Sequence, residues 1–445
     1  MKKILILGAG MVARPLVRYL LGHGYGVTQA DLEAARAVAM IEGHANGRAV
    51  VMNLADASGL HEMIAEHDLV VSLVPPPFHP VVARACLDEG RPMTTASYVA
   101  QEMAALDTEA RAKGISLLNE IGADPGIDIM SSMRVIEAVH ARGGKILSYR
   151  SYCGGLPAPE CVDNPFGYKF SWAPRGVLMA SRSDAEYLDH GRRVRTPGSR
   201  LFRDMHMLQV EGAGDFEAYP NRDSLAYIET FGLDSVRTMV RGTLRNVGWC
   251  DSLHNFARLG LLDLDPVDLT GSTHADLVRR LSGAPAGADP AAAAARHLGL
   301  SLDTLPIANL RWLGMFEETP AGEGLLAPLD VLGALMLRRL AYKAGERDML
   351  VMKHEFVAAY PDGRRERIES QLVDFGIPGG DSSMARTVSL PLAIASRMIL
   401  EGRITAAGVL RPTGAEIYQP VLAELAELGI VFEESTEVIE PAQGT

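Results

Sequence analysis

Two glycines near the start of the chain lie where an apolar strand is expected to meet a helix. Gly8 and Gly10 follow the run Lys3 to Leu7, and Ala13 completes a G-x-G-x-x-A pattern at the start of the next helix. The first glycine permits a tight turn, the second lets the backbone approach a pyrophosphate, and the small third residue allows close packing. The N–H groups of such a helix N-terminus favour phosphate. The pattern predicts a dinucleotide site, with a ligand-free turn as the alternative.

An acidic residue, Asp31, ends the second expected strand, 23 positions after Gly8. A carboxylate at this point accepts hydrogen bonds from an adenosine ribose and repels a 2′-phosphate. It can equally serve as a plain helix N-cap. We therefore expect NAD(H) as the cofactor, with NADP(H) as the alternative.

Polar side chains also follow later strands of the same pattern. The segments Ser72 to Pro75, Thr94 to Tyr98 and Asn119 to Asp128 each come directly after an apolar run. The carboxyl ends of parallel strands meet at one edge of a sheet, and ligands bind there. Turn-capping hydroxyls and a helix N-cap at Asp124 are the purely structural alternatives. His79 could face nicotinamide, but a packing role is favoured.

Three later segments carry glycines, cations and aromatic rings. Ser151 to Pro157 contains a glycine pair whose backbone is open to a ligand, and Gly167 to Gly176 contains Lys169 among aromatic residues. Ala218 to Ser224 places Arg222 in a turn. An arginine fork binds carboxylates through two hydrogen bonds. Although each segment could be a solvated loop, together they suggest a carboxylate substrate.

The elements that must position these residues alternate between short apolar strands and helices up to about residue 120. This alternation predicts a doubly wound parallel sheet of the Rossmann type. A long helix is expected at Ile127 to Ala141, followed by two blocks of strand-like alternation that flank a helical block. The fold class is therefore α/β, a Rossmann-type dinucleotide domain plus a mixed-sheet α/β domain with a helical insertion. The expected domains are 1–126 (completed by about 385–425), 127–250 with 346–384, and 251–345.

Composition excludes several other classes. The 445 residues are 47% hydrophobic and 22% charged, which fits a globular chain of two or three domains. The net charge of −12 argues against a nucleic-acid binder. No apolar run is long enough to span a membrane, and the four cysteines lack metal-ligand spacing. We expect reduced thiols, a cytoplasmic protein and no metal. The motifs of hydrolases, kinases and zinc proteases do not occur.

Several long blocks resemble one family. LILGAGMVARP, NEIGADPGID, GGLPAPE, GYKFSW and AYPNRDS, with other blocks between Lys3 and about Pro412, are similar to the saccharopine reductases, the glutamate-forming saccharopine dehydrogenases. The resemblance implies an enzyme of lysine metabolism that joins glutamate to 2-aminoadipate 6-semialdehyde and reduces the imine to saccharopine. The reverse reaction is an NAD(P)-dependent oxidative cleavage. It also implies a homodimer formed through the sheet domain.

The family's site residues can be carried over where the motifs match. The resemblance implies substrate contacts at Ser97, Tyr98, Asp124 and Arg222, with Gly154, Phe170 and Trp172 as a neighbouring wall. It implies cofactor contacts at Gly10, Met11, Val12, Asn53, Leu54, Val74, Thr94 and Thr95, to which the glycine pattern adds Gly8 and Asp31. Candidates for proton handling are Asp124, Tyr98 and Lys169, with Cys153 a weaker one.

Two departures from the family pattern affect specificity. Eukaryotic members carry a Cys-Arg pair after the second strand, whereas this chain has Asp31 and Leu32. The stretch Val74 to Phe78 also differs from the usual loop. A sister reaction on another amino-acid or polyamine pair therefore stays open. A non-catalytic redox sensor is a third hypothesis, against which the polar residues Asp124, Lys169 and Arg222 argue.

Overall fold

The computed structural model describes residues 1–439, apart from the side chains of residues 57 and 58. The chain divides into two compact units. Unit 1 comprises Met1–Gly144 and Asp374–Glu434, and unit 2 comprises Lys145–Val373 with the residues that follow Glu434. None of the helices in the described part is long and apolar enough to cross a membrane.

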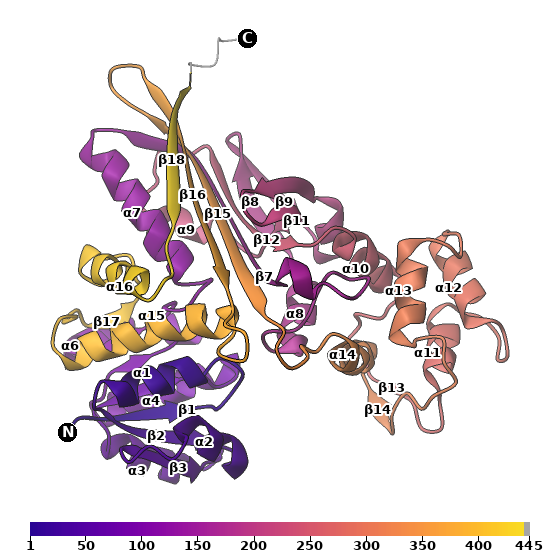
Figure 1. Ribbon diagram of the computed structural model, residues 1–445, viewed down its shortest axis with the longest axis horizontal. Coiled ribbons are helices and arrows are strands. Elements are labelled where there is room, and N and C mark those ends of the chain that lie inside the picture. The colour runs from indigo at the N-terminus through magenta and orange to yellow at the C-terminus, as the bar shows by residue number, and fades with distance from the viewer. Residues whose placement is uncertain (440–445) are drawn as a thin grey trace. The chain divides into compact units, whose positions relative to one another are not determined.

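Unit 1 is built on a parallel sheet, as the sequence predicted, and this sheet has seven strands (Figure 1). Its strands, in sheet order, are β17 (Gly408–Leu410), β6 (Ser116–Leu118), β5 (Met93–Thr94), β4 (Leu69–Ser72), β1 (Lys3–Leu7), β2 (Gly26–Asp31) and β3 (Gly47–Val51). The central strands β1 and β4 are buried almost throughout, because helices cover both faces of a parallel sheet.

Seven helices of unit 1 form two groups. The first group holds α1 (Arg14–Gly22), α2 (Ala34–Ile41) and α15 (Ser383–Leu400), and the second holds α3 (Ala57–Ala65), α4 (His79–Asp88), α5 (Gln101–Ala104) and α6 (Asp107–Lys113). Right-handed crossovers that run in opposite directions from β1 place the two groups on opposite faces. A short 3₁₀ helix, η1 (Pro76–Phe78), precedes α4.

A late segment of the chain completes unit 1. Helix α15 packs on α1, and β17 adds the seventh strand beside β6. Helix α7 (Ile127–Ala141) has the bounds that the sequence predicted. It packs against α16 (Ala415–Glu427), where the Tyr418 hydroxyl donates to Glu137. Unit 1 therefore extends to Gly144, whereas the expected boundary was residue 126.

Unit 2 contains a mixed sheet. Its strands, in order, are β10 (His206–Val210), β11 (Gly214–Pro220), β12 (Thr238–Arg245), β7 (Lys145–Pro157), β15 (Asp348–Ala359), β16 (Arg365–Phe375) and β18 (Glu433–Ile439), with β8 (Ala185–Asp189) and β9 (Arg192–Thr196) joined through β12. β12 runs parallel to β7, and β15 runs antiparallel to it. The carboxyl ends of β7 and β12 therefore lie side by side.

A helical segment interrupts the strands of unit 2, as the sequence predicted. It contains α10 (Trp249–Arg258), α11 (His274–Leu281), α12 (Pro290–Leu298), α13 (Leu305–Leu313) and α14 (Pro328–Arg339), with a small hairpin of β13 (Val267–Asp268) and β14 (Leu325–Leu326). Shorter helices are η2 (Pro159–Cys161), α8 (Pro174–Ala180), η3 (Gly198–Arg203) and α9 (Ala226–Thr230).

Candidate active site

The turn after β1 has the geometry that a pyrophosphate needs. Gly8 has a φ of 101°, and a Cβ at this position would lie 2.7 Å from the carbonyl oxygen of Leu73, so only glycine fits. A Cβ at Gly10, in contrast, would meet nothing within 4 Å. Glycine at position 10 is therefore not required by packing within the protein. It leaves open the space through which a ligand approaches the backbone, and this fits a bound dinucleotide.

Neighbouring elements hold this turn in place. The Gln29 side chain donates to the Gly8 carbonyl oxygen at 2.9 Å, and the Ser389 hydroxyl of α15 donates to the Val12 carbonyl oxygen. Ser389 lies more than 370 positions further along the chain, and the sequence analysis did not single it out. The late helix thus supports the dinucleotide turn.

Asp31 lies at the end of β2 as predicted, and its carboxylate is fixed by the backbone. Oδ2 accepts from the Ala9 N–H at 2.7 Å, and Oδ1 accepts from the Glu33 N–H at 2.9 Å. The side chain is half-buried. These two bonds keep a negative charge at the turn itself, where the sequence analysis expected the ribose.

The other predicted cofactor residues differ in how far their side chains are exposed. Met11 is 57% exposed and Asn53 is exposed, whereas Leu54 and Val74 pack partly against the core. Thr94 and Thr95 are buried, and the Thr94 hydroxyl is bonded to Ser396 of α15 at 2.8 Å. The Thr95 hydroxyl accepts from the Ser97 N–H at 3.3 Å. Both hydroxyls therefore serve the fold, and a ligand would meet the backbone of these threonines rather than their side chains.

Tyr98 and Asp124 form a pair at the carboxyl edge of the unit 1 sheet. The Tyr98 hydroxyl donates to Asp124 Oδ1 at 3.0 Å, and both residues are partly exposed. The structure thus brings together two of the residues proposed for proton handling. Asp124 precedes Pro125, with a cis peptide bond between them, and Gly126 begins the turn into α7.

A buried glutamate that the sequence analysis did not single out as a site residue fixes the segment that carries Tyr98. Glu120 is 1% exposed and has a φ of 56°. Its carboxylate accepts from the Val99 N–H at 3.0 Å and from Arg411 at 3.0 Å, while its own N–H donates to the Ser97 carbonyl oxygen. Glu120 therefore ties the end of β6 to the Ser97–Val99 turn. The sequence feature that could have indicated this role is an acidic residue just after an apolar strand.

The Ser97 side chain is hydrogen-bonded within the protein and is also partly exposed, so a ligand can reach it. Its hydroxyl is 2.7 Å from Nε2 of His79, whose Nδ1 is 2.8 Å from the Ser72 hydroxyl. His79 is 4% exposed, so the packing role favoured from the sequence is accompanied by hydrogen bonds at both ring nitrogens.

In unit 2, Gly154 lies where β7 closely approaches β12. A Cβ there would be 2.7 Å from the Leu244 carbonyl oxygen, so strand packing already requires glycine. Phe170 is 2% exposed and makes an edge contact with Tyr168, and Trp172 is partly exposed. Of the predicted wall residues, Trp172 alone presents a partly exposed side chain.

Lys169 is held by two carboxylates. It is 1% exposed, and its Nζ lies 2.8 Å from Asp163 and 2.7 Å from Glu346. Hydrogen bonds from Lys169 and Lys343 hold the pKa of Asp163 well below its usual range. Burial acts to raise the pKa of Glu346, but the hydrogen bonds from Lys169 and from the Lys343 N–H, together with the charge of Lys169, outweigh burial and lower the pKa. The two ion pairs explain structurally why this side chain can be buried.

Arg222 lies in the turn after β11, and its side chain is exposed. Its φ of 52° is unusual for a residue with a side chain. The backbone is fixed on both sides, because the Arg222 carbonyl oxygen accepts from the Glu186 N–H and the Asn221 N–H donates to the Arg241 carbonyl oxygen. The structure thus holds the predicted arginine at a defined point of unit 2.

A second arginine, Arg245, lies at the carboxyl end of β12 and was not predicted from the sequence. It is 6% exposed and stacks on Tyr168 and Trp249 at 5.0 and 5.5 Å. Within residues 1–439 its side chain makes one hydrogen bond, from Nη1 to the Leu244 carbonyl oxygen, and its buried Nε has no partner. Glu217 is opposite in register, but its carboxylate accepts from the Gly248 and Cys250 N–H groups.

A buried guanidinium without an ion pair is costly, because burial removes the water that would solvate its charge. Two other buried donors of unit 2, Trp249 Nε1 and Ser171 Oγ, also lack a hydrogen-bond partner within the described residues. An unsatisfied buried polar group in a folded protein requires an explanation, and a role in ligand binding or catalysis is one such explanation. The available signal was an arginine at the end of an apolar strand in RGTLRNVGW.

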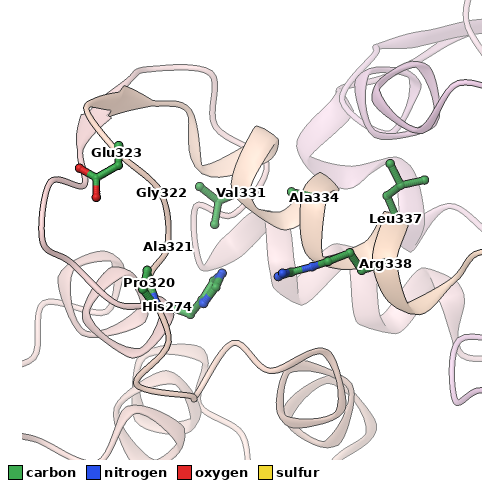
Figure 2. Close-up of a pocket in the computed structure, with 9 residues that line it drawn as sticks. All are labelled: His274, Pro320, Ala321, Gly322, Glu323, Val331, Ala334, Leu337 and Arg338. Carbon is green, nitrogen blue, oxygen red and sulfur yellow. The ribbon is translucent and has the colours of Figure 1, made fainter.

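A hollow of about 460 Å³ lies in the helical segment of unit 2 (Figure 2). His274 and Arg338 point toward each other across it, and Val331 and Leu337 contribute apolar side chains to its lining. None of the residues predicted from the sequence lines this hollow, so it is separate from the chemistry described above. Among the described residues, no group of three or more metal-binding side chains is found.

Two family models match the chain. The saccharopine dehydrogenase NADP binding domain matches residues 4–118, and the saccharopine dehydrogenase C-terminal domain matches residues 122–430. Together they cover both the glycine turn and the segments that carry Arg222 and Arg245.

Similar proteins are found over the whole length. A protein of Schizosaccharomyces pombe named saccharopine dehydrogenase [NADP(+), L-glutamate-forming] is 37% identical, covering 98% of this chain and 99% of its own. The mitochondrial alpha-aminoadipic semialdehyde synthase of Bos taurus is also 37% identical over 97% of this chain, which spans 47% of that protein. The solved structure of apo saccharopine dehydrogenase (L-Glu forming) from Saccharomyces cerevisiae superimposes with a TM-score of 0.88 at 34% identity, covering 98% of this chain and 100% of that one.

Proposed function

Because the chain belongs to the saccharopine dehydrogenase family, we propose that it catalyses the NAD(P)-dependent, reversible reduction of an imine to saccharopine. The imine forms between glutamate and 2-aminoadipate 6-semialdehyde. The chain is an oxidoreductase of lysine metabolism that acts on a CH–NH group. The observation that carries this function is full-length similarity to glutamate-forming relatives together with the open glycine turn of unit 1.

The residues of unit 1 support cofactor binding and proton handling. The N–H groups that follow Gly10, at the start of α1, would hold the pyrophosphate, and Asp31 would accept hydrogen bonds from a ribose. The bound cofactor supplies the hydride. A protonated imine is already electrophilic, so the protein needs only modest acid–base help. The Tyr98–Asp124 pair is suited to hold or release the proton of the substrate nitrogen.

The arginines of unit 2 support recognition of carboxylates. Saccharopine carries three carboxylates, each of which loses water when it binds. We assign Arg222 to one of them, and Arg245 to another because its buried guanidinium has no protein anion as partner. Charge-assisted hydrogen bonds from arginine are among the stronger polar contacts in proteins. Lys169, already held by Asp163 and Glu346, is a weaker candidate for proton handling than the Tyr98–Asp124 pair.

A direct assay tests this function. Purified protein is mixed with saccharopine and either NAD⁺ or NADP⁺, and reduced cofactor is followed by absorbance while glutamate is quantified. We expect glutamate and reduced cofactor in equal amounts. Absence of turnover with both cofactors would refute the reaction, and a redox sensor without catalysis would then remain.

We further propose that NAD(H) is preferred over NADP(H), although the fungal relatives are named for NADP(+). The support is Asp31, whose carboxylate is held at the turn by the Ala9 and Glu33 amides. A unit charge 4 Å from another costs about 1 kcal/mol in water and about 4 kcal/mol near a protein surface. The kcat/KM for NADH should therefore exceed that for NADPH.

The test of this preference is Asp31→Ser, which removes the charge. We expect the ratio of kcat/KM for NADPH to that for NADH to rise by about 10-fold or more, in line with that repulsion. Leu32→Ser, at the adjacent exposed position, serves as the control and should leave the ratio unchanged. A wild-type enzyme that uses NADPH better would contradict the proposal.

We also propose that the chain forms a homodimer through the sheet of unit 2. The support is the family relationship and the prevalence of two-fold symmetric dimers among soluble oligomers. Light scattering at working concentration should give twice the mass of one chain. A mass equal to that of one chain would contradict this assembly.

A further inference from the structure

A buried histidine joins two serines at the carboxyl edge of the unit 1 sheet. Ser72 ends β4 and is fully buried, His79 begins α4, and Ser97 follows β5 and is partly exposed. The ring nitrogens of His79 lie 2.8 Å from the Ser72 hydroxyl and 2.7 Å from the Ser97 hydroxyl. The three side chains therefore form a chain of two hydrogen bonds, which runs from the core to the sheet edge at which Tyr98 and Asp124 lie.

The surroundings fix the charge of the ring. Burial lowers the pKa of His79 to about 4, so the imidazole is neutral at neutral pH. A neutral imidazole has one nitrogen that donates and one that accepts. The two serines must therefore play opposite roles toward the ring.

Burial of Ser72 decides which nitrogen donates. Within residues 1–439, His79 is the one hydrogen-bond partner of the Ser72 hydroxyl. If Nδ1 carried the proton, the Ser72 hydroxyl hydrogen would be buried without an acceptor, and an unsatisfied buried donor costs more than an ordinary hydrogen bond contributes. Ser72 therefore donates to Nδ1, and Nε2 carries the proton and donates to Ser97 Oγ.

The same step fixes the role of Ser97. Its oxygen accepts from His79, so its own hydroxyl hydrogen points to a different acceptor, and residues 1–439 supply none. We propose that His79 is a positioning residue that makes Ser97 a hydrogen-bond donor to a carboxylate oxygen of the amino-acid substrate. This inference rests on the proposed function. It makes the position favour an anionic oxygen over an ammonium group, which can only donate.

The tautomer of His79 is measured first, in the full chain without ligand. The protein is labelled with ¹⁵N-histidine, and long-range proton–nitrogen correlations show which ring nitrogen is protonated. The spectrum of His79→Gln identifies the His79 signals by their loss. We expect Nε2 to be protonated and Nδ1 to be the acceptor at neutral pH, and a protonated Nδ1 overturns the proposal. This result does not depend on turnover. It therefore tests the direction of the two hydrogen bonds of His79 even if the protein does not catalyse the proposed reaction.

A double-mutant cycle then tests the link to substrate. Ser97→Ala should lower kcat/KM for saccharopine by about 10- to 150-fold, the scale of a hydrogen bond to a charged group. His79→Gln should lower it by about 3- to 10-fold through KM, with the dissociation constant of NADH unchanged. The double variant should be no worse than Ser97→Ala, because both changes act on one hydroxyl. Additive losses overturn the proposal.

His67 offers a matched control in the same unit. It is 2% exposed, and its ring nitrogens lie 2.6 Å from the Met63 carbonyl oxygen and 2.8 Å from the Thr28 hydroxyl. His67→Gln removes a similar buried ring but touches none of the proposed site residues. We expect KM for saccharopine to stay at the wild-type value. An equal rise in KM for both variants would show a general folding effect and would also overturn the proposal.

Discussion

Replacing Arg245 with methionine is expected to lower kcat/KM for saccharopine by at least 10-fold and up to about 150-fold, without loss of stability. The activity falls because a charge-assisted hydrogen bond contributes about 1.5–3 kcal/mol and methionine cannot make one. The linear methionine side chain still packs against Tyr168 and Trp249. The comparison requires kcat/KM and the thermal midpoint of the variant and the wild type under the same conditions.

The expected effect on stability distinguishes a substrate-binding role of Arg245 from a purely structural one. Desolvation of an unpaired ion costs several kcal/mol, whereas stacking on aromatic rings contributes about 0.5–2 kcal/mol. Removal of the charge should therefore leave the thermal midpoint unchanged or raise it. Arg245→Lys keeps the charge but not the fork, so it should also lose activity. A methionine variant that is less stable yet fully active would show that Arg245 is a structural residue only.

Lys169→Met is expected to destabilise the protein by about 2–4 kcal/mol. Breaking a buried ion pair costs about 3–5 kcal/mol because the remaining charge is left unpaired. The lower range applies here because the Asp163 and Glu346 side chains are 38% and 17% exposed and water screens them. Denaturant unfolding at pH 7 measures the loss. The folded variant should keep its kcat/KM, and a large fall in kcat at unchanged stability would instead support proton handling by Lys169.

The pH dependence of this loss has a defined sign. The folded-state pKa values of Asp163 and Glu346 are lowered, so their contribution is present above the unfolded pKa of about 4 and is lost as the pH falls. The stability difference between wild type and Lys169→Met should therefore shrink below about pH 4. Lys343→Met is the control, because Lys343 pairs with the same Asp163 but is 71% exposed. It should cost at most about 1 kcal/mol.

The dinucleotide fold was predictable because its signals are local. The apolar strand Lys3 to Leu7, the glycine turn after it and the helix that follows are contiguous in sequence, and the structure has all three. The placement of α7 was less accessible, although its bounds were correct. Helix α7 belongs to unit 1 because it packs against α16, which lies more than 270 residues further along the chain.

The candidate site was predictable to the extent that residues follow strand ends. Tyr98 and Asp124 were expected at one edge, and their side chains are in fact bonded to each other. The roles of Thr94 and Glu120 could not be predicted from the sequence, because they depend on the burial of these side chains. A threonine that bonds to a distant helix and one that faces a ligand look the same in sequence. Arg245 was missed for a related reason, since only the structure shows that its charge has no partner.

Product analysis in the direction of synthesis tests the central claim most directly. The protein is incubated with NADH, glutamate and 2-aminoadipate 6-semialdehyde, and in parallel with 1,3-diaminopropane in place of glutamate, and the products are identified by mass spectrometry. We predict saccharopine from the first mixture and no reduced adduct from the second. A reduced diamine adduct without saccharopine would contradict the account and identify the chain as a sister imine reductase of polyamines.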